Sequence, residues 1–475
     1  MHQRNEPTKK SIFPAIATVL IALMAGMISL SPSVYANSAD VAALERRVAE
    51  LNRELERARQ ELEVARQEKN AAQEQSARAE AKLASRGEPE PAKIKVGPVT
   101  LGGAMRVNYI LGSYPGGGSG PSRGGDGGNF ELDTFRINLS LDSKQLIGKL
   151  EYRWYDGYNF IHTGWLGHEF EDGSQVQAGV TRAPFGPGPY GVSQSWFFDQ
   201  HYYVGLSDDM ELGIKYVTRR GNWDLDFAYF FSSEWNGKGT SDDSARYSYD
   251  AVKWRSGLDQ DGNLVSVPSN GYEERDQFNV RAIYGFDDVA VPTDLGVSLQ
   301  YGQLKGKRAD DGSQWAASAH MLNQIGGFKL ASQITRYEID IDDDNPWGTD
   351  TLIPMGAYDF AWLVATKAWI PAVSLSYKYR TQQIPWLDYV LPYLEYSSII
   401  KDESDFNDSQ MWTLGAAWAR GGWYIYSDMA YSNGNYFVGD DGDDYSNIFQ
   451  GVGDFGVDGN DKWNYRFNLN FGYYF

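Results

Sequence analysis

The feature that most constrains the fold is a strict two-residue alternation over the last thirteen residues, 463–475. Every second position is apolar: Trp463, Tyr465, Phe467, Leu469, Phe471, Tyr473 and Phe475. The positions between them hold three asparagines, one arginine, one glycine and one tyrosine. Successive side chains of a β-strand point to opposite faces, so the pattern predicts a long strand with one aromatic face and one polar face. In a soluble sandwich such a strand would leave a flat aromatic edge exposed, which invites aggregation.

Shorter alternating segments recur from Val99 onward, separated by connectors rich in Gly, Asp, Asn and Ser. The clearest are 104–111, 135–141, 149–154, 278–284, 373–380 and 412–418. We count sixteen or seventeen candidate strands, and antiparallel closure requires an even number. The sequence therefore predicts an all-β, antiparallel β-barrel of about sixteen strands, with eighteen as the alternative. We expect tight turns at 143–145, 219–222 and 420–422, and long polar loops at 112–129, 233–275, 340–356, 399–409 and 433–461.

Alternation alone does not distinguish a soluble β-sandwich from a transmembrane barrel. In the sandwich the apolar face packs a core, whereas in the barrel it faces lipid and the polar face lines a water-filled lumen. Composition favours the barrel, because aromatic residues make up 14% of a chain whose mean hydropathy is −0.48. An aromatic C-terminal residue, here Phe475, is also typical of outer-membrane barrels.

Residues 1–36 are expected to be a signal peptide. Three basic residues precede an apolar stretch from Ile12 to Leu30, and residues 34–36 form a suitable cleavage site. The alternative is an uncleaved membrane anchor, because the apolar stretch is nearly long enough to span a bilayer. No second apolar stretch of that length occurs, so only a barrel would let the processed chain cross a membrane.

Residues 37–86 are expected to form an α-helical coiled coil. Apolar residues step by three and four along a heptad seam: Val41, Leu44, Val48, Leu51, Leu55, Ala58, Leu62 and Ala65. A lone solvated helix is the alternative, and the heptads do not distinguish a dimer from a trimer. Residues 87–97 begin with Gly-Glu-Pro-Glu-Pro and are expected to be a stiff linker. The barrel then occupies residues 98–475.

Several classes of function are disfavoured by what the sequence contains. The chain has no cysteine and a formal net charge of −20, which exclude cysteine-ligated metals and disfavour nucleic acid as a partner. No catalytic motif occurs and the five histidines are scattered, so we expect no enzyme activity, no cofactor and no metal site. Acidic runs at 340–344 and 440–444 lack the spacing of a calcium-binding loop, and solvated loops are the preferred interpretation.

Strand parity sorts the charged residues by face. Basic residues predominate on the predicted inner face, and the candidates for pore-lining selectivity residues are Arg106, Arg136, Arg153, Arg281, Lys378 and Arg380. A basic lumen lowers the barrier for anions. The alternative is that these cations only pair with inward acids. A register error of one residue would turn each of them toward lipid.

One stretch resembles a known family. Residues 179–186 (GVTRAPFG), Pro189-Tyr190, residues 196–205 (WFFDQHYYVG) and residues 208–216 (DDMELGIKY) are similar to the phosphate-selective porin family and its dicarboxylate-type trimeric relatives. The resemblance implies a sixteen-stranded, trimeric outer-membrane porin of a gram-negative bacterium, with the coiled coil in the periplasm. It also implies that residues 183–208 are an inward-folded constriction loop, whose candidate residues are Arg182, Pro184, Phe185, Asp199, Tyr202 and Asp208.

The chain departs from the phosphate-trapping pattern of that family. No Lys or Arg lies between Ala183 and Met210, whereas tight phosphate binding requires a ladder of such residues. We therefore expect passive diffusion of small hydrophilic solutes, preferentially anions such as dicarboxylates. The alternatives are a non-selective porin and a structural barrel that links the outer membrane to peptidoglycan through the coiled coil.

Overall fold

The computed structural model describes residues 46–47, 50, 53, 94–112, 128–240, 244–258, 260, 264–268, 271–287, 289–344, 348–380, 384, 386–435, 437–438, 455–457 and 461–475. The chain divides into two compact units, Met1–Gly87 and Glu88–Phe475. In the first unit the four described residues are helical, and Arg47 Nη1 lies 2.9 Å from Glu50 Oε2. The expected signal peptide, most of the expected coiled coil and residues 87–93 of the expected linker lie outside the described residues.

None of the described helical segments is both long enough and apolar enough to cross a membrane.

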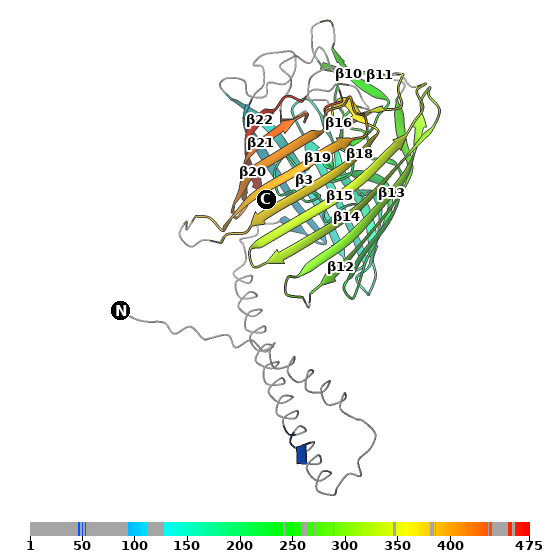
Figure 1. The fold of residues 1–475 in the computed structure, drawn as a ribbon. Coiled ribbons are helices and arrows are strands. Elements are labelled where there is room, and N and C mark those ends of the chain that lie inside the picture. The colour runs from blue at the N-terminus through cyan, green and yellow to red at the C-terminus, as the bar shows by residue number, and fades with distance from the viewer. Residues whose placement is uncertain are drawn as a thin grey trace, which may run out of the picture. The chain divides into compact units, whose positions relative to one another are not determined.

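In the second unit a single antiparallel sheet contains seventeen strands, sixteen of which form a closed barrel (Figure 1). The first eight barrel strands are β2 (Val99–Gly112), β3 (Asn129–Ser143), β4 (Leu146–Trp154), β5 (Asn159–Glu169), β6 (Gln175–Arg182), β7 (Met210–Arg220), β8 (Trp223–Ser233) and β12 (Tyr272–Phe286). The other eight are β13 (Thr293–Gly306), β14 (Gly312–Ile325), β15 (Phe328–Asp340), β18 (Lys367–Tyr377), β19 (Tyr389–Lys401), β20 (Ser409–Arg420), β21 (Trp423–Asn433) and β22 (Asn464–Tyr474).

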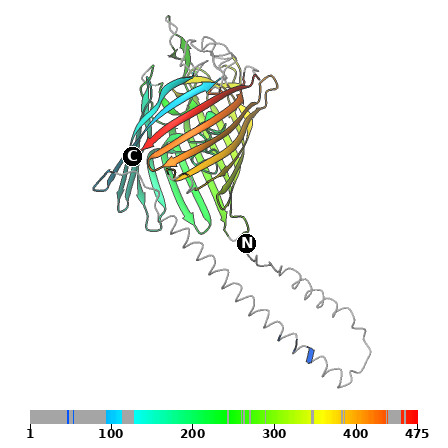
Figure 2. The ribbon, with the colours of Figure 1, turned by 90° about the vertical axis from the view of Figure 1, so that its left-hand side faces the viewer.

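The barrel closes where β22 pairs with β2, from Ala104 opposite Tyr474 to Gly112 opposite Arg466 (Figure 2). The prediction of sixteen strands is confirmed, and the alternative of eighteen is wrong. The remaining strand of the sheet, β1 (Ile94–Val96), forms a hairpin with the start of β2. Residues expected in the linker therefore already belong to the sheet. The three expected tight turns all join neighbouring barrel strands.

The wall has an apolar outer face and a polar inner face. Along β22, Tyr465 and Tyr473 are exposed, whereas Asn468 and Asn470 are buried. The asparagines of the inner face form hydrogen bonds with polar side chains of the neighbouring strand. Asn470 Nδ2 donates to Asn108 Oδ1 at 2.6 Å. This order is the reverse of a soluble domain, where apolar side chains are buried and polar ones are exposed. It confirms the alternation predicted from the sequence.

Aromatic pairs gather at both ends of the strands on the outer face. Near the tight turns the pairs are Trp223–Tyr284, Phe328–Tyr377 and Trp423–Tyr473, with ring centroids 4.4 to 5.0 Å apart. Near the longer connections they are Tyr109–Phe130, Tyr229–Phe278 and Tyr396–Trp412, with centroids 4.5 to 5.0 Å apart. Two aromatic girdles that flank an apolar band are the pattern of a transmembrane β-barrel.

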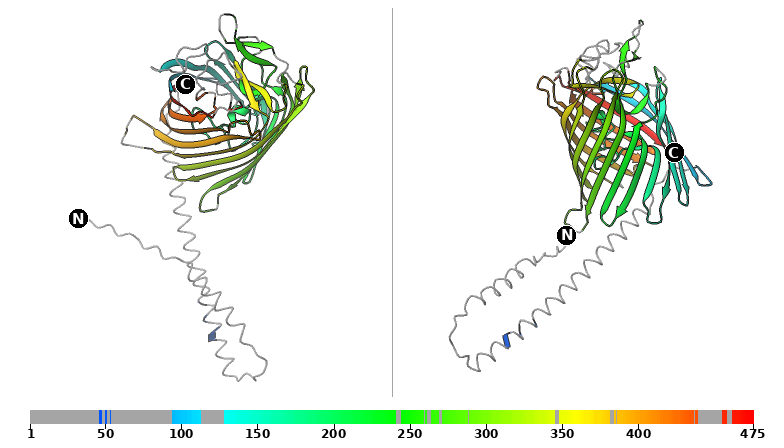
Figure 3. Two further views of the ribbon diagram at one scale, coloured as in Figure 1. Left: turned by 45° about the horizontal axis from the view of Figure 1, so that its top comes forward. Right: turned by 90° about the vertical axis from the view of Figure 1, so that its right-hand side faces the viewer.

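Two segments expected as plain loops contain strands. Within 233–275 lie β9 (Arg246–Ala251), β10 (Trp254–Leu258) and β11 (Leu264–Pro268), and near 340–356 lie β16 (Leu352–Tyr358) and β17 (Phe360–Ala365). Strands β9, β16 and β17 form a three-stranded sheet, which we call the inner sheet, and β10 pairs with β11. All six residues of β9 are buried. Figures 1 and 3 show β10, β11 and β16 at the end of the barrel opposite the tight turns.

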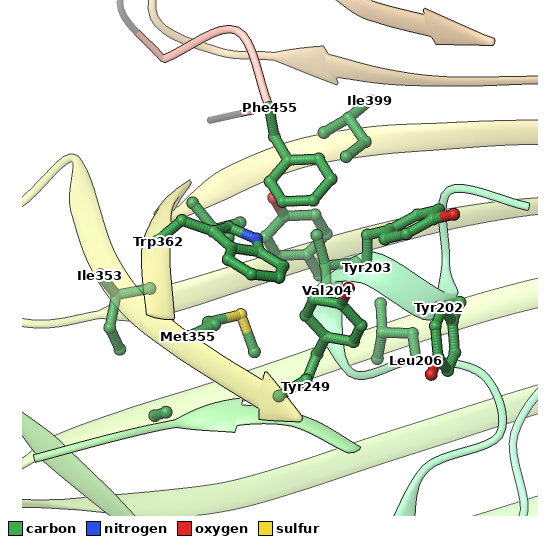
Figure 4. Packing of buried hydrophobic residues seen from close by; sticks show 14 of the residues in the cluster. Tyr202, Tyr203, Val204, Leu206, Tyr249, Ile353, Met355, Trp362, Ile399 and Phe455 are labelled. Atoms are coloured by element: carbon green, nitrogen blue, oxygen red, sulfur yellow. The ribbon is translucent and has the colours of Figure 1, made fainter. Parts of the chain in front are cut away.

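The inner sheet packs against the connection between β6 and β7, residues 183–209, which contains the short 3-10 helix η2 (Tyr202–Val204). Figure 4 shows Tyr202, Tyr203, Val204 and Leu206 of this connection facing Tyr249, Met355 and Trp362 of the inner sheet. The main apolar core of the unit therefore lies inside the barrel, between the connection and the inner sheet.

Candidate pore and constriction

The connection 183–209 runs from β6 across the lumen to the opposite wall. Gly186 N donates to Ser298 Oγ on β13 at 3.0 Å. His201 Nε2 lies 2.8 Å from Thr335 Oγ1 on β15, and Gln200 N donates to Ser397 Oγ on β19 at 3.1 Å. Strand β19 is eight places from β6 around the sixteen-stranded wall, which is the far side of the barrel.

Two buried wall carboxylates hold the middle of this connection. Glu395 on β19 accepts a hydrogen bond from Ser193 Oγ at 2.7 Å, and another from the backbone N–H of Gln194. Asp428 on β21 accepts one from the backbone N–H of Trp196 at 2.9 Å. Buried carboxyl oxygens are nearly always hydrogen-bonded, because leaving one without a partner is costly. The connection is therefore fixed at several points across the lumen.

A cavity of about 600 Å³ lies between this connection, the inner sheet and wall strands β2, β3, β4, β14, β15, β21 and β22. Its lining is rich in tyrosine, including Tyr155 and Tyr158, whose rings stack with centroids 5.1 Å apart. Burial raises the pKa of Tyr158, Tyr202 and Tyr358, which lie outside the barrel strands. These phenols stay neutral and offer the cavity hydroxyl groups rather than charge.

The charged lining of the cavity comprises five basic residues (Arg106, Arg136, Arg153, Lys329 and Arg466) and four acidic residues (Glu131, Asp133, Asp156 and Asp208). Arg106 Nε lies 2.7 Å from Asp133 Oδ2. Arg136 and Arg153 share one carboxylate, since Glu151 Oε1 lies 3.2 Å from Arg136 Nη1 and 2.6 Å from Arg153 Nη2.

Arg466 differs from these three arginines, because its contacts are with a backbone carbonyl, an amide side chain and an aromatic ring. Its guanidinium donates to Phe437 O at 3.0 Å and to Asn468 Oδ1 at 2.9 Å, and lies over the ring of Trp196 at 4.8 Å from the centroid. Among the ion pairs formed by the described residues, none includes Arg466 or Lys329. Counted over its own lining residues, the cavity therefore has a formal excess of one positive charge.

Of the six predicted pore-lining residues, only the first three line the cavity: Arg106, Arg136 and Arg153. Arg281 Nε donates to Asp226 Oδ2 at 2.7 Å, away from the cavity. Lys378 and Arg380 follow the end of β18. Lys378 Nζ lies 3.9 Å from the centre of the Tyr389 ring, and Arg380 is exposed.

The predicted constriction residues also divide into two groups. Tyr202 and Asp208 line the cavity. The side chain of Arg182 pairs with Asp208 Oδ1 at 2.6 Å and lies over the ring of Tyr190. Pro184 and Phe185 are buried outside the lining, and Asp199 braces the connection by accepting the N–H groups of residues 192 and 201.

Comparison with known proteins gives structural matches only. No protein-family model matches the sequence, and no curated protein matches it. Similar solved structures include OmpT in its trimer form, an outer membrane protein of Vibrio cholerae, with 14% identity, 80% of this chain and 100% of that chain covered and a TM-score of 0.48. Another is the outer membrane channel DcaP of Acinetobacter baumannii, with 13% identity, 81% and 100% covered and a TM-score of 0.48. A third is an anion-selective porin from Comamonas acidovorans, with 13% identity, 79% and 99% covered and a TM-score of 0.46.

Sequence reasoning missed much of the aromatic lining. Tyr155 and Tyr158 lie between β4 and β5, and Tyr358 lies where β16 meets β17. None of these positions belongs to a periodic segment that marks its side chain as inward. Arg466 and Lys329 are different, because the parity of β22 and β15 places both on the polar face.

Proposed function

We propose that this protein is an outer-membrane porin that lets small hydrophilic solutes diffuse passively, with a preference for anions. The observation that carries the proposal is the cavity lined by charged and tyrosine side chains inside a closed barrel whose outer face is apolar. An apolar outer face requires lipid, and a polar lumen supplies a path for water and solutes. The aromatic girdles at both strand ends support the same location.

The preference for anions rests on the charge of the lining. Two arginines share Glu151, and Arg466 and Lys329 add positive charge to the same cavity. In a narrow lumen surrounded by low-dielectric material, this excess lowers the barrier for an anion. Arg106, Arg136 and Arg153 already have carboxylate partners. A passing anion therefore competes with those partners, which favours transit of dicarboxylates or similar solutes over tight trapping of phosphate.

The proposal includes the assembly and its surroundings. We infer a homotrimer in the outer membrane of a gram-negative bacterium, with residues 37–86 as a periplasmic coiled coil that can reach toward peptidoglycan. The heptad seam supports association of the chains, because a lone helix of that composition gains little stability by itself. Chemical cross-linking of the protein in native outer membranes tests this: a band at three times the monomer mass is expected, and monomers alone would contradict it.

Planar-bilayer conductance under a salt gradient tests the transport proposal. The protein refolded without residues 1–36 should give stepwise openings in groups of three, with a reversal potential that favours anions. A reversal potential that favours cations would leave a porin but overturn the anion preference.

A second candidate is a closed structural barrel that tethers the outer membrane. The observation in its favour is the apolar core inside the barrel, which fills the space between the connection 183–209 and the inner sheet. A folded, heat-modifiable barrel that shows no conductance would support this candidate over the porin.

A further inference from the structure

Three buried carboxylates meet at the base of the connection 183–209. Asp209 is its last residue, Glu211 lies in β7 of the wall, and Asp250 lies in β9 of the inner sheet. One carboxylate oxygen from each side chain lies within 4.8 Å of the others, and the exposed fractions of the residues are 4%, 1% and 1%. Residues from three separate elements therefore place their oxygens around one buried point.

Several of these oxygens have no hydrogen-bond partner. In the part of the chain that the structure describes, none is found for either carboxylate oxygen of Glu211 or for Asp209 Oδ1. Burying an ionised carboxylate without a partner is costly, and buried polar groups in folded proteins are nearly always satisfied. The Glu211 side chain, which is 1% exposed, has two unpartnered oxygens and faces two further carboxylates, so the geometry is suited to hold a cation.

The surroundings increase the negative charge. Glu234 and Glu274 also lie near this group, and each fixes β9 by accepting hydrogen bonds from its backbone N–H groups through one oxygen. Among the described residues the group makes a single ion pair, between Arg246 Nη1 and Asp250 Oδ2 at 2.8 Å. One guanidinium faces five carboxylates, so most of the negative charge is not offset by protein.

We propose that Asp209, Glu211 and Asp250 bind one calcium ion, with Glu234 beside them as a further oxygen donor. An all-carboxylate donor set selects a hard cation. Calcium–oxygen distances of about 2.3–2.6 Å place opposite ligands about 5 Å apart, which accommodates the observed spread, whereas Mg²⁺ requires a tighter shell. No such site is expected from sequence alone, because the whole of β8 separates Asp209 from Asp250.

The ion would join three parts of the barrel at one point. Asp209 also closes the base of the connection, since its carbonyl oxygen accepts the N–H of Ala183 at 2.8 Å. Calcium at this point ties the connection and the inner sheet, whose Tyr249 is shown in Figure 4, to wall strand β7. Removing calcium should therefore destabilise the connection 183–209 and the inner sheet before it destabilises the strands of the wall.

Calcium binding by the whole refolded protein in detergent tests the proposal. The protein is stripped with EGTA and titrated with CaCl₂ by calorimetry, and its melting temperature is compared in EGTA and in calcium. We expect one ion per chain, weaker binding of MgCl₂ and a higher melting temperature with calcium. A wild-type protein that neither binds calcium stoichiometrically nor melts differently in the two buffers would overturn the proposal, whatever the variants do.

Variants locate the ion. Glu211→Gln keeps the shape of the side chain and removes its charge, and should weaken calcium binding by about tenfold or more. Asp250→Asn is the second ligand variant. Asp226→Asn is the matched control, because Asp226 is also buried on the inner wall but pairs with Arg281, and it should bind calcium like wild type. A combined change of the exposed acids 342–344 to Asn tests the acidic loop. Unchanged binding in Glu211→Gln, or lost binding in the loop variant, would overturn the assignment.

Discussion

Strand β22 in the wall and strand β9 inside the barrel show two ways in which a strand can be built. Along β22, buried asparagines alternate with exposed or half-buried aromatic and aliphatic side chains, whereas all six residues of β9 are buried. A wall strand separates two media, lipid and water, so its sequence alternates with a period of two. An inner strand has protein on both faces, so nothing forces alternation. The wall strands can therefore be recognised from their local sequence. The segments inside the barrel, which are the connection 183–209 and the inner sheet, depend on contacts between residues that are distant in the sequence.

The largest expected effect comes from breaking the outer face of the wall. Leu414, near the middle of β20, is 64% exposed. Leu414→Arg should lower the free energy of unfolding by about 2–4 kcal/mol, because arginine is unfavourable near the bilayer midplane. Urea unfolding in lipid vesicles measures this, with Leu414→Met as the control. Equal stability of the arginine variant would mean that this face does not contact lipid.

A substitution inside the barrel should change the conductance of the channel more than the stability of the wall. Glu395→Ala removes the acceptor for Ser193, Gln194 and Ser374, and the change should cost about 1–3 kcal/mol. We expect a changed single-channel conductance with an intact, heat-modifiable barrel. Glu338→Ala, which removes a carboxylate that pairs with Lys367 near the end of β15, controls for charge alone. Loss of the folded barrel in the Glu395 variant would show that wall and contents are not separable.

The next prediction concerns ion selectivity. It compares the predicted pore-lining residues that line the cavity with those that lie outside it. Changing Arg106 and Arg136 to Gln should reduce the permeability ratio of anions to cations severalfold, because both line the cavity. The same change at Arg281, Lys378 and Arg380 should leave the ratio near wild type, because these residues lie outside the cavity lining. Reversal potentials in planar bilayers measure both variants. Equal shifts in the two would remove the basis for placing the selectivity at this cavity.

The smallest effect is expected within the packed contents. Tyr202→Phe removes the hydrogen bond between the hydroxyls of Tyr202 and Tyr358 and keeps the ring in the aromatic core. The loss should be about 1 kcal/mol. Chemical unfolding followed by fluorescence measures it, and Tyr301→Phe on the outer face provides a control that should be close to neutral. A much larger loss would mean that this hydroxyl pair holds the connection across the lumen.

Periodicity was enough to predict the sixteen strands and the polarity of both faces, as β22 illustrates. It also placed Arg106, Arg136 and Arg153 on the inner side. It did not predict which inward residues reach the cavity: Lys378 and Arg380 continue the alternation of β18 but lie beyond its last residue, Tyr377. Periodicity did not predict the inner sheet, which consists of β9, β16 and β17. These strands do not alternate, because their side chains, such as Tyr247, Tyr249 and those of 361–365, are buried by packing against the connection 183–209.

The seam between β2 and β22 has a consequence for how the molecule forms. Every other pairing in the wall joins barrel strands that follow one another along the chain, so most of the sheet can grow by successive hairpins. The seam is the exception: the hydrogen bond from Asn470 to Asn108 spans 362 residues of chain. Closing a loop of that length in an unstructured chain would cost about 5 kcal/mol in entropy, apart from a constant. Prior assembly of the hairpins removes most of that cost, so the rate-limiting event in folding should be the meeting of the two seam strands.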